Sequence, residues 1–218
     1  MSTPQLTFEP SEHRYFLGQD EVPALTRILE DMGFSGFDDL PGSVMAKVER
    51  KRLIGDAVAK ACEMWDKGEE MESLHPEIEP YFNAYAEFSE KYKPRTRFNQ
   101  KGWDQIEQVH LVNRGVLGAG SQVPVRFACR LDRAGIIEGE DHLGVVEIKC
   151  TFKREKYHRL QTAAQGLALS PERHLPRFAL YLDKTGKYKL DPHKEHSQDL
   201  MAWGQVLLAW HWRKEYGR

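Results

Sequence analysis

The fold class depends on the stretch Val145-Val146-Glu147-Ile148-Lys149-Cys150, which follows Arg130-Leu131-Asp132-Arg133 in the chain. Along a strand, successive side chains point to opposite faces, so Glu147 and Lys149 project together from one face. The opposite face carries the side chains of Val146, Ile148 and Cys150. A surface ion pair on an edge strand is the ordinary explanation of an isolated E-x-K, and the two residues alone leave it open.

Asp132 supplies a second carboxylate. It ends the preceding predicted strand, and a turn from Gly135 to Gly144 would bring it alongside Glu147. Two neighbouring carboxylates bind Mg²⁺ or Mn²⁺ well, because these hard cations prefer oxygen ligands and cancel the repulsion between the pair. Lys149 beside them would position an attacking water and a scissile phosphate. The three residues therefore fit metal-assisted phosphodiester hydrolysis, but without further context the surface ion pair remains the favoured interpretation.

The order of helices and strands predicted along the chain indicates one α/β domain over residues 1–218, without repeats or linkers. It divides into an N-terminal hairpin and helices (1–95), a catalytic sheet with one helix rich in glutamine (103–190) and a C-terminal packing helix (197–214). Within these parts, the spacing predicts a hairpin over 6–22, helices over 25–32, 43–67 and 76–91, strands over 106–111, 123–131 and 145–150, a helix over 155–169 and a hairpin over 178–190. Trp203 and Trp210 share the buried stripe of the last helix, whereas His193 and His196 are expected to be exposed cap residues.

The composition excludes a uniformly basic nucleic-acid-binding protein and a small disulfide-stabilised protein. The chain has 218 residues, with 31 Lys and Arg against 33 Asp and Glu and a net charge of −2, so any phosphate-binding surface must be local. Its three cysteines are far apart and exclude a disulfide framework. We expect a protein of the cytoplasm, with no secretory leader and no membrane-spanning segment.

Five segments carry motifs in a recognisable order: 22–29 (VPALTRIL), 55–63 (GDAVAKACE), 127–133 (FACRLDR), 146–151 (VEIKCT) and 160–169 (LQTAAQGLAL). This ordered set, with its D-x14-E-x-K spacing, resembles the RecB-like and phage-type exonuclease branch of the PD-(D/E)XK nuclease superfamily. The similarity covers residues 6 to about 183. It implies a restriction-endonuclease-like core, in which a central mixed β-sheet is flanked by helices.

The resemblance also implies roles for single residues. Asp132, Glu147 and the main-chain carbonyl of Ile148 would bind the metal, and Lys149 would be the catalytic lysine. The helix would contribute Gln161 and Gln165, which would lie along the DNA backbone or position Lys149. Weaker candidates for the metal site are Glu107 and Glu63. The three cysteines rule out the four-cysteine iron–sulfur cluster of some relatives.

Positive charge gathers just before this helix, in Lys153, Arg154, Lys156 and Arg159. Cations that flank an acidic metal centre would receive a phosphate backbone, although a solvated helix face is the alternative interpretation of the run.

We expect a Mg²⁺- or Mn²⁺-dependent deoxyribonuclease, an exonuclease acting on DNA ends or single strands in recombination or repair. A recombination protein is a candidate partner, and the host cytoplasm is the expected location if a phage encodes the chain. The family commonly carries a metal-binding histidine where this chain has Ala59 and a tyrosine where it has Gln165. A silenced member that binds DNA or a protein without cutting is therefore the alternative, and a carboxylate-metal hydrolase with another substrate is a third, disfavoured one.

Overall fold

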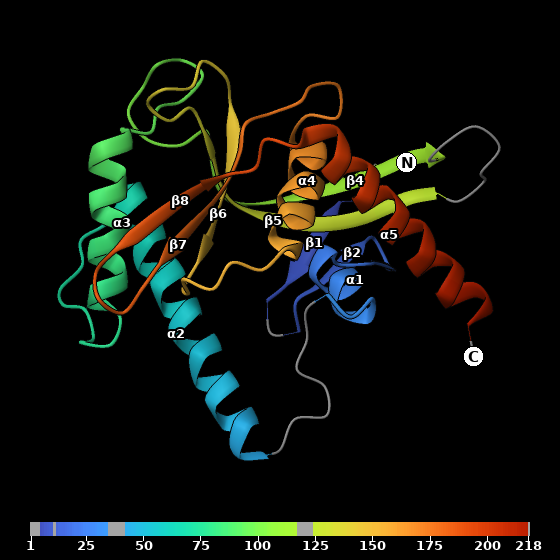
Figure 1. Cartoon of the computed structure of the whole chain (residues 1–218), viewed down its shortest axis with the longest axis horizontal. Coiled ribbons are helices and arrows are strands. Elements are labelled where there is room, and N and C mark those ends of the chain that lie inside the picture. The colour runs from blue at the N-terminus through green and yellow to red at the C-terminus, as the bar shows by residue number, and fades with distance from the viewer. Residues whose placement is uncertain (1–4, 11, 35–41, 117–123, 218) are drawn as a thin grey trace.

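A computed structural model describes residues 5–10, 12–34, 42–116 and 124–217 of the chain (Figure 1). The described elements, in chain order, are β1 (Leu6–Glu9), β2 (Arg14–Leu17), β3 (Asp20–Val22), α1 (Leu25–Asp31), α2 (Gly42–Lys67), α3 (Glu79–Tyr92), β4 (Gln105–Val116), β5 (Pro124–Gly135), β6 (Gly144–Lys149), α4 (Tyr157–Leu169), β7 (Arg177–Leu182), β8 (Tyr188–Pro192) and α5 (His196–Tyr216). The expected helices and strands are present, with ends that differ by a few residues. Val123, the expected start of one strand, lies outside the described residues.

The main sheet contains five strands in the order β4-β5-β6-β7-β8. Neighbouring strands are antiparallel except for β6 and β7, which run parallel. Parallel neighbours need a crossover connection, and α4 provides it here. The expected mixed sheet is thus confirmed. Because β6 is the middle strand, the alternative that Glu147 and Lys149 form an ion pair on an edge strand is wrong.

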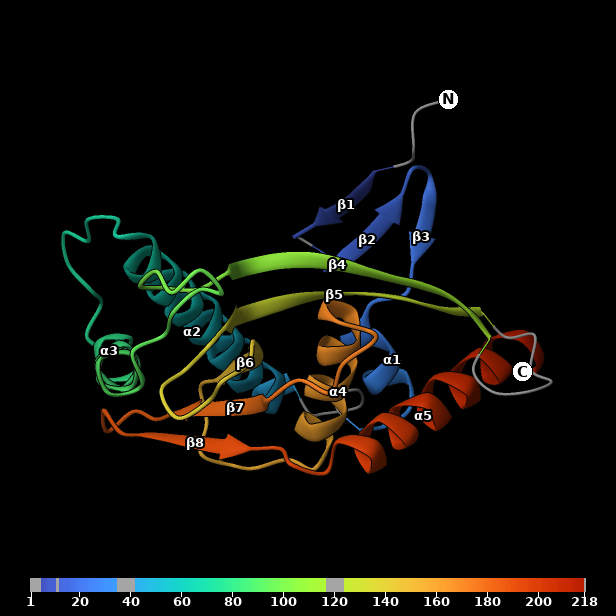
Figure 2. The same ribbon diagram turned by 90° about the horizontal axis from the view of Figure 1, so that it is seen from above.

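Helices cover both faces of this sheet (Figures 1 and 2). On one face, α1, α4 and α5 pack against β4 and β5 around a core that includes Leu25, Phe127, Leu131, Leu160 and Trp203. On the other face, α2 and α3 pack against β6 and β7 around a core that includes Val58, Tyr85, Phe88, Val146 and Leu180. The alternation predicted for β6 follows from this layering, because Val146 faces α2 and α3 while Glu147 faces α4.

The N-terminal segment forms a separate sheet of three strands, β1-β2-β3. The expected hairpin is present, but β3 extends it. A small core of Tyr15, Val22, Ala24 and Ala128 packs this sheet against β5, and the main-chain N–H of Ala128 donates to Pro23 O at 2.9 Å. The N-terminal sheet thereby docks on β5 through β3.

The C-terminal helix α5 buries Trp203 and Trp210, as its stripe predicts. The expectation for His193 is wrong, because this residue is only 6% exposed and its Nδ1 lies 2.8 Å from Thr162 Oγ1 on α4. The end of β8 returns to β7 here, with the N–H of His193 donating to Arg177 O. The expectation for His196 is also wrong, because this first residue of α5 is half-buried rather than exposed. Among the described residues, no helix is long and apolar enough to cross a membrane.

Candidate active site

Asp132, Glu147 and Lys149 come together at the middle of the main sheet. β5 and β6 pair antiparallel in a register that places Asp132 beside Glu147. The main-chain N–H of Ile148 donates to Asp132 Oδ2 at 2.7 Å, and Lys149 Nζ donates to Glu147 Oε1 at 2.8 Å. The side chains lie as the alternation along the strand predicts.

Two glutamines of α4 reach the same carboxylate. Gln161 Nε2 donates to Glu147 Oε1 at 2.6 Å, while Gln161 Oε1 accepts from Lys149 Nζ at 2.9 Å. Gln165 Nε2 donates to Glu147 Oε2 at 2.5 Å and to the main-chain oxygen of Arg130 at 3.3 Å. These partners determine how each amide is oriented, because a carboxylate only accepts and an ammonium only donates. Gln161 therefore holds Lys149 in position.

Burial and the neighbouring carboxylates together set the pKa values of Asp132 and Lys149. Burial, followed by the charges of Glu147 and Glu107, raises the pKa of Asp132 well above its ordinary value. Burial lowers the pKa of Lys149, but the charges of Glu147 and Asp132 outweigh this and leave the pKa above its ordinary value. Lys149 is thus an ammonium at neutral pH. Asp132 is a carboxyl group whose ionised form a bound cation would stabilise.

These side chains line one pocket of about 250 Å³ between the main sheet, α4, α2, α1 and the first turn of the chain. Its wall contains six of the residues that we predicted for the site: Asp132, Glu147, Ile148, Lys149, Gln161 and Gln165. It also contains polar residues that we did not predict: His13, Tyr15, Thr26, Asp56 and Arg130. Asp56 lies within the motif of residues 55–63, so that motif could have identified it. No sequence pattern connects His13 with the sheet.

Ala59 of α2 lies in the wall of this pocket. The PD-(D/E)XK resemblance assigns a metal-binding histidine to this position, and the short methyl group leaves that part of the wall without a nitrogen ligand. Among the described residues, no three His, Cys, Asp or Glu side chains converge into a metal-binding group. Asp132 and Glu147 remain the two predicted side-chain ligands, and the predicted third ligand is the main-chain oxygen of Ile148.

Glu107 does not line the pocket wall. Its Oε1 accepts from Arg133 Nη1 at 2.9 Å, and its Oε2 lies 3.0 Å from Arg130 Nε. The backbone φ of Glu107 is 52°, which is uncommon for a residue other than glycine. Burial raises the pKa of Glu107 in spite of the two arginines. Glu107 therefore contacts the site through Arg130 and Arg133.

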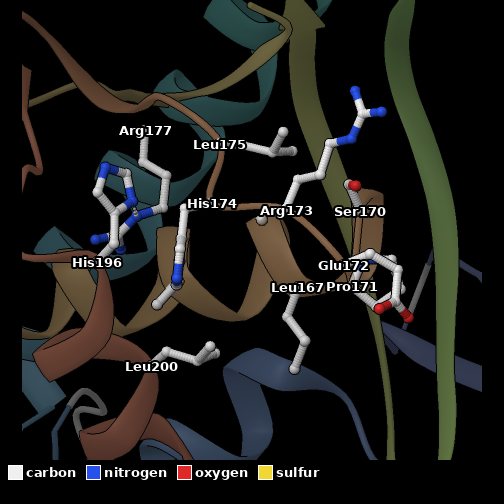
Figure 3. A pocket seen from close by; sticks show the side chains of 12 residues that line it. Leu167, Ser170, Pro171, Glu172, Arg173, His174, Leu175, Arg177, His196 and Leu200 are labelled. Atoms are coloured by element: carbon white, nitrogen blue, oxygen red, sulfur yellow. Dashed lines mark hydrogen bonds between the residues drawn. The ribbon is translucent and has the colours of Figure 1, made fainter.

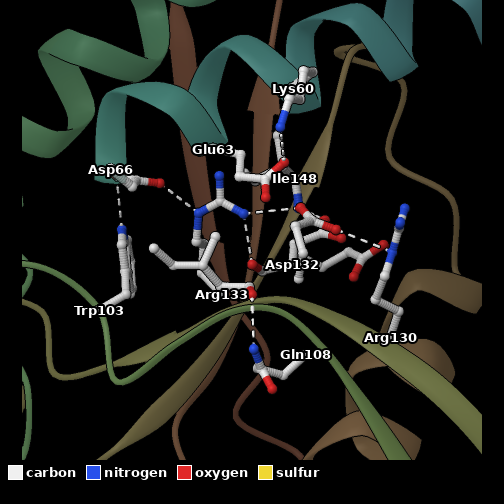
Figure 4. Close-up of polar contacts among 12 residues, drawn as sticks. Lys60, Glu63, Asp66, Trp103, Gln108, Arg130, Asp132, Arg133 and Ile148 are labelled. Carbon is white, nitrogen blue, oxygen red and sulfur yellow. Dashed lines mark hydrogen bonds and ion pairs between the residues drawn. The ribbon is translucent and has the colours of Figure 1, made fainter. Parts of the chain in front are cut away.

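Glu63 and Asp66 on α2 also have partners outside the pocket (Figure 4). Glu63 pairs with two lysines of its own helix, Lys60 at 3.1 Å and Lys67 at 2.5 Å. The side chain of Asp66 is only 4% exposed. Its carboxylate accepts from Tyr85 Oη at 2.6 Å, from Trp103 Nε1 at 3.2 Å and from Arg133 Nε at 2.5 Å. Because Arg133 Nη1 also donates to the main-chain oxygen of Asp132, this network continues from α2 to the site.

Of the four basic residues that we predicted to bind DNA, three precede α4 and Arg159 lies in its first turn. None of them lines the pocket, and three of the four are paired. These pairs join Lys153 to Glu155 at 2.5 Å, Arg154 to Asp191 at 3.1 Å and Arg159 to Asp199 at 2.8 Å. Lys156 is exposed and forms no ion pair with any residue in the described ranges. The Lys153 and Arg154 pairs lie on the surface and are weak, so a phosphate backbone could exchange with Glu155 and Asp191. Asp199 is buried and also pairs with Arg177, so the same argument does not extend to Arg159.

No protein-family model matches the chain, and its sequence matches no curated protein. The assignment of a family and an activity consequently depends on the site itself and on the motif resemblance.

A second, smaller pocket of about 100 Å³ lies where the end of α4 meets the start of α5 (Figure 3). Arg177 forms part of its wall, but the guanidinium already donates to Asp199 Oδ2 at 2.7 Å and to His193 O at 3.3 Å. None of the predicted site residues lines this pocket.

A larger groove of about 880 Å³ opens beside the candidate active site and shares His13, Thr26 and Asp56 with its wall. Its cations have acidic partners, for example Arg14 with Glu21 at 2.8 Å. The groove thus carries charges of both signs and has no excess of positive charge.

Proposed function

We propose that this protein is a metal-dependent deoxyribonuclease with a restriction-endonuclease-like core. The single observation that carries this function is the connected set of Asp132, Glu147, Lys149 and Gln161 in one pocket. Two carboxylates beside an oriented ammonium form the donor set that phosphodiester hydrolysis requires. The order of motifs in the sequence supports DNA as the substrate.

The donor set fits Mg²⁺ or Mn²⁺. Carboxylate and carbonyl oxygens are the ligands that these cations prefer. Burial, and after it the charges of Glu147 and Glu107, raise the pKa of Asp132, and a cation would offset that negative charge. Asp132, Glu147 and the Ile148 carbonyl would hold it. When bound, the cation supplies an acidified water and stabilises charge on the phosphate.

Lys149 acts here as a donor and not as a base, because its amine is protonated at neutral pH. Its Nζ donates hydrogen bonds to Glu147 Oε1 and Gln161 Oε1, and these two bonds fix the ammonium at the pocket wall. From there, Lys149 would donate to a phosphate oxygen or orient the attacking water. Gln161 is a positioning residue, since it acts through Lys149.

In the cell, the protein would act on DNA ends or single strands during recombination or repair, with a recombination protein as a candidate partner in the cytoplasm. The basic residues Lys153, Arg154, Lys156 and Arg159 would receive the phosphate backbone. Gln165 was assigned to the same contact by the resemblance, but its amide is turned toward Glu147.

The test is digestion of end-labelled linear and closed circular DNA in Mg²⁺, in Mn²⁺ and in EDTA. We expect the wild-type protein to degrade linear DNA with either cation and Lys149→Ala to lose at least about a hundredfold in rate. Lys189→Ala is the matched control, because Lys189 is an exposed lysine of β8 outside the pocket. Equal rates for wild type and Lys149→Ala would disprove the assignment of Lys149.

One observation favours the second candidate, a silenced protein that binds DNA without cutting. Ala59 occupies the position at which the resemblance expects an imidazole ligand, and both oxygens of Glu147 already accept from protein donors. Ala59→His distinguishes the candidates. If wild type is inert, Ala59→His cuts and Lys149→Ala in that background does not, the wild type is a silenced nuclease. If all variants are inert while DNA is retained on the protein, binding is the function.

A further inference from the structure

Every oxygen of the Glu147 carboxylate has a protein donor. Oε1 accepts from Lys149 Nζ and Gln161 Nε2, and Oε2 accepts from Gln165 Nε2 at 2.5 Å. Glu147 and both glutamines are buried, with 5%, 6% and 2% exposure. A cation that enters the pocket and binds Glu147 therefore meets a carboxylate whose negative charge is already shared with N–H groups.

The two glutamines differ in how firmly they are held. Gln161 is fixed at both ends of its amide, by Glu147 on the nitrogen and by Lys149 on the oxygen. Gln165 donates to Glu147 Oε2 and, at the long distance of 3.3 Å, to Arg130 O. Within the described residues, no hydrogen bond to the Gln165 amide oxygen holds it in place. The Gln165 amide can therefore leave the carboxylate without disturbing Lys149, whereas Gln161 cannot.

We propose that Gln165 competes with the divalent cation for Glu147 Oε2 and so sets the cation affinity of the site. In the metal-free protein, its amide N–H offsets the charge of Glu147. When a cation arrives, the amide rotates off Oε2, and the hydrogen bond that is lost weakens the net affinity. This inference rests on the proposed function, because Glu147 is taken as a cation ligand there.

The test measures Mn²⁺ binding without DNA, by electron paramagnetic resonance of free Mn²⁺ and by titration calorimetry. A hydrogen bond to a charged group contributes enough that its removal from the metal-free state changes an affinity about tenfold. We expect Gln165→Leu to bind Mn²⁺ about tenfold more tightly than wild type. Gln161→Leu is the matched control from the same helix and the same carboxylate, and we expect no gain from it, since Lys149 still occupies Oε1.

Gln165→Met repeats the experiment with an unbranched side chain, and far-ultraviolet circular dichroism verifies that each variant is folded. If Gln165→Leu and Gln165→Met bind Mn²⁺ no more tightly than wild type, or if Gln161→Leu shows the same gain, the competition does not exist, and the proposed nuclease function is unaffected. Asp132→Asn separates the two hypotheses. If this variant binds Mn²⁺ as wild type does, the cation lies elsewhere, and the proposed metal site fails together with the role of Gln165.

Discussion

The proposed role of Asp132 as a metal ligand requires an ionised carboxylate, and ionisation of this residue destabilises the metal-free protein. Its folded-state pKa is raised by burial and then by Glu147 and Glu107, so the folded protein binds a proton more readily than the unfolded chain does. Stability is then highest below the unfolded-state pKa of about 3.9 and decreases as the pH rises through that value toward the folded-state pKa. At neutral pH, the ionised carboxylate is consequently unfavourable in the metal-free protein.

Asp132→Asn is therefore expected to stabilise the metal-free protein at pH 7 by about 0.5–2 kcal/mol. The asparagine oxygen can still accept from the N–H of Ile148, while the repulsion from Glu147 is removed. Urea unfolding in EDTA, followed by tryptophan fluorescence, measures the difference, which should shrink toward about pH 4. The exposed Asp20→Asn serves as control, and a loss of stability in Asp132→Asn would contradict the expected direction.

At the scale of the elements, two neutral imidazoles anchor α4. His158 Nδ1 lies 2.8 Å from Tyr181 Oη of β7, and His193 Nδ1 lies 2.8 Å from Thr162 Oγ1 of α4. Burial, with smaller effects from Lys149 and His193, lowers the pKa of His158 to about 3. Burial followed by Arg177 lowers the pKa of His193 to about 4. Because both folded-state values are below the ordinary 6.5, this stability is present above pH 6.5 and is lost as the pH falls.

We accordingly expect acidification from pH 7 to pH 5 to destabilise the protein, by up to about 2 kcal/mol for each of the two imidazoles. His193→Gln and His158→Gln should each reduce the slope of stability against pH, since the substituted side chain binds no proton in the unfolded state. Urea unfolding at a series of pH values measures that slope. His142→Gln, at an exposed histidine, should keep the wild-type slope; a slope that is equally steep in all four proteins would exclude the buried imidazoles as its origin.

For the whole molecule, Asp66 connects segments that are distant in sequence. Its carboxylate joins α2 to Tyr85 of α3, to Trp103 before β4 and to the fully buried Arg133 of β5. Arg133 then donates to the main-chain oxygen of Asp132. The packing of α2 and α3 against the sheet is thus coupled to the strand that carries the candidate metal ligand.

Asp66→Ala should destabilise the protein by about 3–5 kcal/mol, because it leaves the guanidinium of Arg133 buried with less compensating charge. Thermal or urea unfolding measures this loss. Glu49→Ala is the control on the same helix: Glu49 pairs with Arg52 at 2.6 Å on the exposed surface, and such pairs contribute little. If both substitutions shift the unfolding midpoint equally, the buried network does not stabilise the fold as we expect.

The sequence by itself determined the elements and the face on which the candidate residues lie. The alternation through Val146, Glu147, Ile148 and Lys149 depends on strand geometry alone, and the stripe with Trp203 depends on helix geometry alone. The i, i+4 spacing of Gln161 and Gln165 likewise predicts that both lie on one helix face. Both donate to Glu147 in the structure. These features are local, so one segment contains all the information that they require.

Only the tertiary structure decided which residues meet across segments. Glu107 contacts Arg130 and Arg133 rather than the pocket, and Glu63 pairs with lysines of its own helix. His193 is buried against Thr162, and His13 reaches the pocket wall from the N-terminal turn. The physical reason is that a charged or polar side chain selects among several partners, and the docking of whole helices and strands determines which partner lies within hydrogen-bonding distance.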